Sequence, residues 1–295
     1  MLFSLRSLRS LTALFWLTCS AFLVCCKAFA VEPTINKLSV GDRDISVWVW
    51  QPAGKSKGVI LFSHGNASAP WKYDPLIQPW VAAGFAVYGP LHVDSTDHPH
   101  HDQYKGMDSW RTRLEDMQLL ADTYGQNGYI AAGHSYGALT ALVKGGANAL
   151  VPEGVASPTA DPRVSLVLAF SPPPAIPGFI DKQGYAGLAV PALIQTGTKD
   201  IPMGGANDWT GHLDAYEMSA ASGDHYALIL EGVDHYFGGA ICRPELPGPK
   251  LIDELKQASD ISLLMIDAYT LGQQSATKLL SKQLSEQGPV VFRLK

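Results

Sequence analysis

Short apolar runs alternate with longer segments of helical spacing from about residue 45 onward. Several of these runs, such as residues 59–62 and 166–170, contain no polar position, as expected for strands with helices on both faces. The alternation predicts an α/β fold in which a mostly parallel sheet is flanked by crossover helices. The expected strands are residues 45–50, 59–63, 85–89, 129–132, 164–170, 192–196 and 226–230.

Residues 45–50 differ from the other runs because their side chains alternate in kind. Val47 and Val49 fall on one face of this segment, and Trp48 and Trp50 fall on the other. Alternation of this sort is typical of an antiparallel strand rather than a buried parallel one. We therefore expect residues 45–50 to form an antiparallel edge strand at the start of the sheet.

Two long helices are expected. Asp108 is a suitable N-cap for a helix that reaches about Tyr124. In this helix the apolar residues at helical spacing are Leu114, Met117, Leu120 and Ala121, and the residues expected largely on other faces are Arg111, Arg113, Glu115 and Asp116. A second helix is expected over residues 261–284, where Leu263, Leu264, Ile266, Leu271 and Leu279 require a core to cover.

The first 30 residues have the pattern of a secretory signal peptide. Two arginines give a basic start, residues 11–26 are nearly continuously apolar, and Ala28-Phe29-Ala30 has the small residues that a signal peptidase accepts. The apolar run is shorter than the roughly 20 residues needed to span a bilayer. A retained anchor and a lipidated Cys25 or Cys26 are the alternatives. We expect cleavage near Ala30, export to the periplasm or the medium, and one domain over residues 31–295.

Removal of the signal peptide changes the cysteine count and the charge. Cys242 becomes the only cysteine, and the formal net charge moves from −5 to −8, because the segment carries three basic residues and no acidic one. A lone cysteine forms neither an internal disulfide nor a zinc–thiolate cluster. The acidic balance, with no run of Lys and Arg after Lys27, argues against a nucleic-acid partner. No cofactor and no stable membrane insertion after cleavage are expected.

A G-x-S-x-G pentapeptide with the sequence GHSYG occupies residues 133–137. It follows the expected strand at 129–132 and precedes a helix-compatible segment at 138–144. Glycines at both ends permit the sharp strand-to-helix turn that lifts a serine hydroxyl above the sheet in a strained backbone conformation. The pentapeptide occurs by chance in many proteins as a plain turn. Its position between a strand and a helix identifies Ser135 as the candidate nucleophile.

A serine hydroxyl requires a base within hydrogen-bond reach and a third group that orients the base. Asp200 and His235 each follow an expected strand, so both should lie at the same edge of the sheet as Ser135. Asp208 and Asp234 are the rival acids, and Asp234 adjoins the histidine, from where it is poorly placed to reach the same ring. We predict Asp200 as the orienting acid and His235 as the general base. A helix cap or turn is the competing interpretation of Asp200.

Backbone donors must stabilise the negative charge that develops on the acyl oxygen. The amide of Tyr136, directly after the candidate nucleophile, is the first predicted donor. The sequence Ser-His-Gly-Asn at 63–66 follows an early expected strand, and Gly65 permits a close turn that aims the amide of Asn66 inward. A plain glycine turn with a structural His64 is the alternative.

The His-Gly loop at 64–65, the GHSYG elbow and the Gly-Thr-Lys-Asp turn at 197–200 resemble the α/β-hydrolase superfamily, in particular its dienelactone-hydrolase-like and chlorophyllase or cutinase-like esterases. The resemblance spans about residues 45–240 and includes the chain order Ser, Asp, His. It implies carboxylester hydrolysis through an acyl-enzyme, without metal or cofactor. Dienelactone hydrolases proper use cysteine where this chain has Ser135, so their substrate does not carry over. The superfamily also includes lipases, peptidases, thioesterases and perhydrolases.

The loop after the expected strand at 85–89 is crowded with histidine and aspartate, which are ligands for divalent metals. These residues are His92, Asp94, Asp97, His98, His100, His101 and Asp102. Their spacing matches no known ligand pattern, and such loops are more often a polar surface or the rim of a site. No metal site is therefore predicted.

Together these features predict a serine esterase that acts on small or medium acyl esters. Residues 175–190 are too few for a large lid. A peptidase or thioesterase with the same triad is the alternative, and a non-catalytic binding protein of the same fold is a more distant one. Five aromatic residues are candidates for pocket walls, with core packing as the competing role: Trp71, Tyr73, Tyr136, Trp209 and Phe237.

Overall fold

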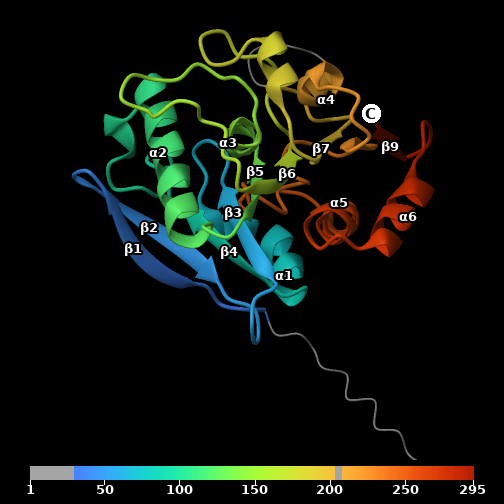
Figure 1. The fold of residues 1–295 in the computed structure, drawn as a ribbon, viewed down its shortest axis with the longest axis horizontal. Helices are drawn as coiled ribbons and strands as arrows, with labels where there is room; N and C mark the ends of the chain where they lie inside the picture. Colours follow the sequence, from blue (N-terminus) through green and yellow to red (C-terminus); the bar gives the residue numbers. More distant parts are fainter. Residues whose placement is uncertain (1–29, 203–207) are drawn as a thin grey trace, which may run out of the picture.

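The computed structural model describes residues 30–202 and 208–295, so the predicted signal peptide lies outside the described residues except for Ala30. The described residues contain one mixed sheet of nine strands (Figure 1), which confirms the predicted α/β class. Across the sheet the strands follow the order β1 (Thr34–Val40), β2 (Arg43–Trp50), β4 (Phe85–Pro90), β3 (Gly58–Ser63), β5 (Tyr129–His134), β6 (Val164–Phe170), β7 (Ala192–Gly197), β8 (His225–Leu230) and β9 (Val290–Leu294).

The centre of the sheet is parallel and its margins are antiparallel. Strands β4, β3, β5, β6, β7 and β8 are parallel neighbours, whereas β2 pairs antiparallel with β4, as its alternation predicts. The predicted position of β2 at the edge is wrong, because β1 pairs along its outer side with Thr34 opposite Val49. β9 adds a second antiparallel margin beside β8. Most of β1 is exposed, so no alternation of buried and exposed residues marks it in the sequence.

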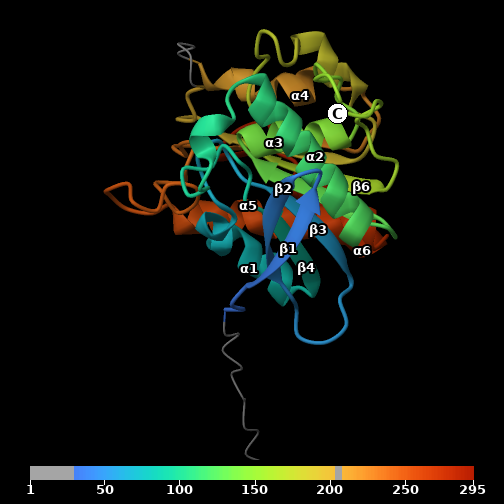
Figure 2. The same cartoon turned by 90° about the vertical axis from the view of Figure 1, so that its left-hand side faces the viewer.

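Helices cover both faces of the sheet, and each face has its own hydrophobic cluster (Figures 1 and 2). One cluster includes Trp80, Leu255 and Leu280, and the other includes Leu114 and Ala138. The first face carries α1 (Asp74–Ala82), α5 (Ile252–Met265) and α6 (Gln274–Gln283), and the second carries α2 (Met107–Tyr124), α3 (Tyr136–Lys144) and α4 (Asp214–Met218). This double coverage explains why the central strands are uniformly apolar.

The predicted single helix over residues 261–284 is wrong. α5 already begins at Ile252, a π-helical turn spans Ile266–Thr270, and α6 starts only at Gln274. Gly272 adopts a φ of 67°, the left-handed conformation that commonly ends helices. Both helices bury residues in the same cluster, so the apolar spacing continues across the break.

The segment between β6 and β7 is short, as the sequence predicts. It contains an isolated bridge between Ile176 and Ile180 and a 3-10 helix at Lys182–Gly187. It therefore forms no large lid. Among the described residues, no helix has the length and apolar character required to cross a membrane.

Candidate active site

Ser135 occupies the sharp turn between β5 and α3. Its backbone adopts φ 56° and ψ −122°, a conformation that a non-glycine residue rarely takes and that costs on the order of 1–3 kcal/mol. The two glycines of the motif are required by close packing. A Cβ on Gly133 would lie 2.3 Å from the carbonyl oxygen of Gly137, and one on Gly137 would lie 1.9 Å from that of Ser63. The motif therefore forms the strained elbow that the sequence predicts.

Asp200 and His235 come together at the carboxyl ends of β7 and β8. His235 Nδ1 lies 2.7 Å from Asp200 Oδ1, and Thr196 donates its hydroxyl to Asp200 Oδ2 at 2.9 Å. Asp200 is fully buried, whereas the side chain of His235 is 18% exposed. Because the carboxylate accepts the Nδ1 proton, Nε2 of His235 is left free to accept a proton from elsewhere. We call Ser135, Asp200 and His235 the candidate triad.

Burial favours a neutral carboxylic acid and so raises the pKa of Asp200. The hydrogen bonds and charges of His212 and His235 outweigh that effect and hold the pKa of Asp200 well below its usual range. The acid of the candidate triad is therefore ionised at neutral pH. Among the hydrogen bonds of the described side chains none involves the hydroxyl of Ser135, so its hydrogen bond to Nε2 of His235 has to form when a substrate is bound.

The two rival acids have other partners. Asp234 Oδ1 accepts the amides of Tyr236 and Gly238, at 2.8 and 3.0 Å, and so shapes the loop that carries His235. Asp208 is exposed and accepts the amide of Thr210 at the start of a 3-10 helix. Of the three candidate acids, Asp200 alone contacts the His235 ring.

The loop after β3 lies beside the candidate nucleophile. A Cβ on Gly65 would lie 2.9 Å from the Tyr73 hydroxyl oxygen and 3.1 Å from His134 Nδ1, so the absence of a side chain permits the loop to pack against these two residues. Cβ of Ser135 would be 3.4 Å away. Asn66, the predicted second donor, follows directly and is exposed. Tyr136 is the first residue of α3, where amides lack intrahelical acceptors. The two predicted donor residues thus flank Ser135 from two different elements.

His134 joins three parts of the site. Its Nε2 donates to the carbonyl of His235 at 2.8 Å, and its Nδ1 accepts the hydroxyl of Tyr73 at 2.9 Å. Tyr73 in turn accepts the amide of Gly65 at 2.9 Å. Burial, with a smaller effect of the His235 charge, lowers the pKa of His134 to about 3, so this ring is neutral. The elbow, the histidine loop and the loop after β3 are therefore tied together.

Arg113 lies fully buried beneath the loop after β3. Its guanidinium donates to the carbonyls of His64 and Gly65, at 2.8 and 3.3 Å, and pairs with Asp94 at 2.7 Å. It also lies 4.4 Å from the centre of the Tyr136 ring. Burial raises the pKa of Asp94, but Arg113 outweighs it and lowers that pKa to about 2. One guanidinium thus contacts both segments that carry the predicted oxyanion donors.

A second Ser–His–Asp arrangement lies next to Arg113. Ser63 Oγ is 2.9 Å from His92 Nε2, and His92 Nδ1 is 2.7 Å from Asp116 Oδ2. All three side chains are fully buried, and Arg43 forms an ion pair with the other carboxylate oxygen of Asp116 at 2.5 Å. We call Ser63, His92 and Asp116 the sealed chain. No solvent reaches it, so it contributes to structure rather than to chemistry.

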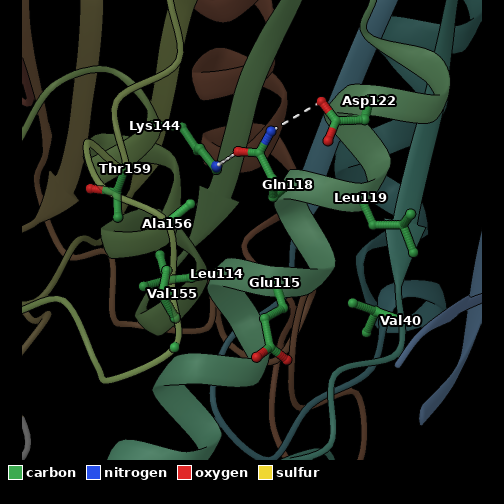
Figure 3. A pocket seen from close by; sticks show the side chains of 11 residues that line it. Val40, Leu114, Glu115, Gln118, Leu119, Asp122, Lys144, Val155, Ala156 and Thr159 are labelled. Atoms are coloured by element: carbon green, nitrogen blue, oxygen red, sulfur yellow. Dashed lines mark hydrogen bonds between the residues drawn. The ribbon is translucent and has the colours of Figure 1, made fainter. Parts of the chain in front are cut away.

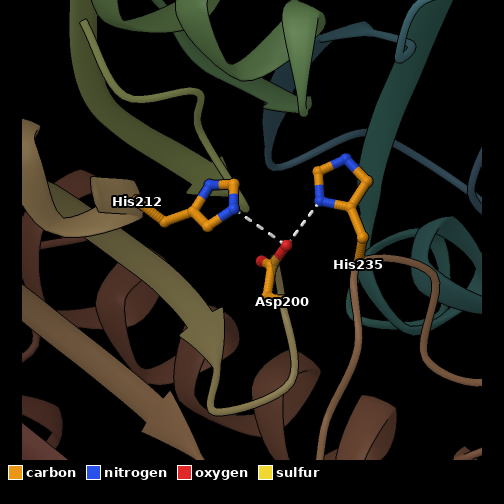
Figure 4. A group of neighbouring side chains, drawn as sticks. All are labelled: Asp200, His212 and His235. Atoms are coloured by element: carbon orange, nitrogen blue, oxygen red, sulfur yellow. Dashed lines mark hydrogen bonds and ion pairs between the residues drawn. The ribbon is translucent and has the colours of Figure 1, made fainter. Parts of the chain in front are cut away.

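The histidine-rich loop does not gather its residues around one point. His92 belongs to the sealed chain, Asp94 pairs with Arg113, and Asp97 pairs with Lys72 at 2.6 Å. Over residues 30–202 and 208–295, the one group of three or more potential ligands close enough to bind an ion is Asp200, His212 and His235, a set drawn from other segments (Figure 4).

The predicted pocket aromatics divide into two groups. Tyr73 and Phe237 are fully buried and belong to the core, whereas Trp71, Tyr136 and Trp209 are half-buried. Trp71 packs on Trp48 with ring centres 4.6 Å apart. The core interpretation therefore holds for two of the five.

A pocket of about 210 Å³ lies between α2, the end of β1 and residues 154–159 (Figure 3). Lys144 donates to Gln118 at 2.7 Å there, and Gln118 donates to Asp122 at 3.0 Å. Burial lowers the pKa of Lys144 to about 8. The residues lining this pocket include no member of the candidate triad, and they offer no nucleophile paired with a base.

Sequence reasoning missed several residues that support the site. Arg113 and Asp116 were expected largely away from the apolar face of α2, but both are fully buried. The burial of Arg113 could have been predicted, because Arg113 is four residues from the apolar Met117 and shares one side of the helix with it. His134 is one of the two variable residues of the pentapeptide, and His212 lies outside every motif. Nothing in the sequence marks either as a partner.

Comparisons with known proteins reveal similarity in fold only. No protein-family model and no curated protein matches the chain in sequence. An alpha-beta serine hydrolase homologue from Coxiella burnetii is similar with a TM-score of 0.56 and 14% identity, covering 79% of this chain and 99% of that chain. Esterase 2 of Thermogutta terrifontis phosphorylated by paraoxon gives a TM-score of 0.60 and 16% identity, covering 81% and 95%. Its propionate-bound form gives 0.58 and 16%, covering 80% and 93%.

These comparisons confirm that the chain has the α/β-hydrolase fold, with its mixed sheet flanked by helices. Membership of the α/β-hydrolase superfamily, and of its dienelactone-hydrolase-like or chlorophyllase or cutinase-like branch, stays a prediction.

Proposed function

We propose that this protein is a serine hydrolase that cleaves carboxylic esters through an acyl-enzyme. The observation that carries the proposal is a strained, half-buried serine on a strand-to-helix elbow, at the same sheet edge as a hydrogen-bonded Asp–His pair. The relatives in fold include proteins described as a serine hydrolase homologue and as esterases, which supports the same chemistry. The substrate is a small-molecule ester, and no metal or cofactor takes part.

In the proposed reaction, Ser135 Oγ attacks the acyl carbon while His235 Nε2 accepts its proton. The carbonyl π electrons move onto oxygen, and the amides of Tyr136 and Asn66 stabilise the oxyanion. The tetrahedral intermediate collapses, the alcohol leaves with the proton from His235, and the acyl group stays on Ser135. Water, deprotonated by the same histidine, then releases the acid. Asp200 stabilises the imidazolium in both halves.

We propose in addition that the enzyme works after export, with residues 1–30 removed. Val31 would be the first residue of the mature chain. Its amide donates to Gln78 Oε1 at 2.9 Å, and its carbonyl accepts Gln78 Nε2 at 2.8 Å. The new terminus would therefore be attached to α1 from its first residue.

Hydrolysis of p-nitrophenyl acetate and p-nitrophenyl octanoate by the purified mature protein tests this function. We expect activity on at least one ester, and Ser135→Ala should lower kcat by on the order of 10⁶-fold, as for other triad serines. Ser39→Ala, which alters an exposed serine on β1, is the matched control and should retain full activity. Inactivity of the wild type towards both esters, or unchanged activity of a folded Ser135→Ala, would refute the proposal. Activity on amide or thioester analogues alone would favour the peptidase or thioesterase.

A further inference from the structure

The carboxylate of Asp200 has a second imidazole beside it. His212, from the 3-10 helix Trp209–Leu213, places Nε2 2.9 Å from Asp200 Oδ1, the oxygen that also accepts from His235. The two rings approach this oxygen from opposite sides (Figure 4), with centres 5.6 Å apart. His212 is only 2% exposed, so its polar atoms have to be satisfied inside the protein.

The contact of the other ring nitrogen, Nδ1, shows that this atom of His212 carries a proton. Nδ1 lies 2.6 Å from the carbonyl oxygen of Pro172, which can only accept, so Nδ1 carries hydrogen. A neutral ring would then place an unprotonated, electron-rich Nε2 2.9 Å from an oxygen of an ionised carboxylate, which is repulsive. A protonated ring places a positive charge there instead, which is attractive even without the alignment of a hydrogen bond. The contact is too bent for a regular hydrogen bond, so charge rather than alignment must hold it.

A metal ion is a poorer explanation than a proton. Ligand atoms around a zinc ion lie about 2.0–2.2 Å from the metal, and His235 would have to offer Nδ1 as a bare lone pair. In this structure Nδ1 of His235 is 2.7 Å from Asp200 Oδ1, the separation of a charge-assisted hydrogen bond. A bound metal would thus remove the hydrogen bond that orients the base.

We propose that His212 is a positioning residue that remains an imidazolium and shares the Asp200 carboxylate with His235. The proposal rests on the hydrolase function above. His212 orients Oδ1 from one side while Thr196 binds Oδ2 from the other. The carboxylate is thereby fixed in rotation before His235 acts.

The second cation also changes the charge balance of catalysis. With His212 charged, the buried carboxylate is already neutralised, so His235 gains less stabilisation when it accepts a proton. The other titratable groups around Asp200 and His235 do not offset the charge of His212. His134 is neutral, and Tyr236 is neutral because burial raises its pKa. The charge of His212 should therefore be visible in the pH dependence of the reaction.

The acids on the segment of His212 are engaged elsewhere. Asp208 accepts the amide of Thr210, and Asp214 pairs with Lys182 at 2.8 Å and accepts the amide of Ala175. Asp200 is therefore the carboxylate that His212 contacts.

Two substitutions separate the contacts of His212. His212→Asn places an amide near the Nδ1 position, where it can still donate to Pro172, but it loses Asp200. His212→Gln reaches towards Asp200 with a neutral donor. We expect both to move the acid limb of the kcat/KM profile to higher pH by about one to two units, the usual effect of removing a charge within 4–6 Å. kcat should fall further in His212→Asn, which leaves Oδ1 with one partner.

His225→Asn is the matched control. His225 is also 2% exposed, with both ring nitrogens facing carbonyls, those of Ala220 and Val190, at 3.1 and 3.0 Å. It has no contact with Asp200, so its replacement should leave the acid limb in place. Superposable profiles for wild type and both His212 variants would overturn the proposal.

Nitrogen NMR of the mature protein labelled with ¹⁵N-histidine gives a test that requires neither activity nor a folded variant. At pH 7 both nitrogens of His212 should resonate at imidazolium positions, and His235 should show one bare nitrogen. A neutral His212 would overturn the proposal. If the wild type hydrolyses no ester, the proposed function fails, while this spectrum still decides the charge of His212.

Discussion

The sealed chain is more completely hydrogen-bonded than the candidate triad, yet it is the one that we exclude from catalysis. Ser63 contacts His92 at 2.9 Å and His92 contacts Asp116 at 2.7 Å, with all three side chains fully buried. In the candidate triad only the acid and the histidine are in hydrogen-bond contact, at 2.7 Å. Hydrogen-bond geometry by itself therefore does not identify a catalytic site.

Backbone and access separate the two arrangements. Ser63 ends a regular strand and donates its hydroxyl within a dry interior, where Arg113 also contacts Oγ at 3.1 Å. Ser135 lies on a strained turn, half-buried, beside a histidine whose side chain is 18% exposed. Burial lowers the pKa of His92 well below its usual range, so this ring stays neutral and cannot act as a base that cycles through imidazolium. A site needs a reachable nucleophile and a base that can be charged.

The largest expected effect on activity distinguishes Asp200 of the candidate triad from Asp116 of the sealed chain. Asp200→Asn should lower kcat by about 10⁴-fold, because the amide favours the wrong tautomer of His235, as in other Ser–His–Asp enzymes. Asp116→Asn should act on stability instead, lowering the free energy of unfolding by about 1–3 kcal/mol, because a neutral amide weakens the buried contact with Arg43, which keeps its pair with Glu115 at 3.0 Å. Ester hydrolysis and urea unfolding of both variants measure this, with turnover expressed per folded molecule. A large loss of kcat in Asp116→Asn with full activity in Asp200→Asn would show that the sealed chain, and not the candidate triad, is catalytic.

A smaller effect on rate is expected for substitution of Arg113, which contacts Ser63 of the sealed chain and the ring of Tyr136 next to Ser135. Arg113→Met leaves Asp94 as an unpaired buried anion and should lower the free energy of unfolding by about 3–5 kcal/mol. It also frees the loop that carries Asn66, so kcat should fall by up to about 10²–10³-fold, the value for one lost oxyanion donor. Arg113→Lys, which retains the charge and loses the forked contact, is the matched variant and should show a smaller loss in both. Urea unfolding and steady-state kinetics measure the two effects. Full activity in folded Arg113→Met would show that the loop needs no such support.

The sequence predicts the parallel centre of the fold well because each central strand is an unbroken apolar run, as in 164–170, which is found with the same bounds. It fails at the margins, where β1 is mostly exposed and carries no clear period. It also fails at Gly272, because α5 and α6 bury the same core on either side of the break.

For the site, the sequence identifies residues whose role is local to a motif and misses those whose role depends on tertiary contact. Asp200 and His235 follow strands, so their meeting could be predicted from strand order. His212 reaches the same carboxylate only through the path of a 3-10 helix, and Arg113 reaches the loop after β3 across the fold. Such long-range contacts leave no pattern in a single sequence.

The identity of the serine that reacts is the most direct test of the central claim. Paraoxon offers a phosphorus centre from which an activated serine displaces p-nitrophenolate, leaving a diethylphosphoryl group on Oγ. After incubation with the mature protein, intact mass and peptide mapping count and locate the label. We predict one group per chain, on Ser135, absent in Ser135→Ala and never on Ser63. A label on another residue, or no label on an otherwise folded protein, would contradict the account.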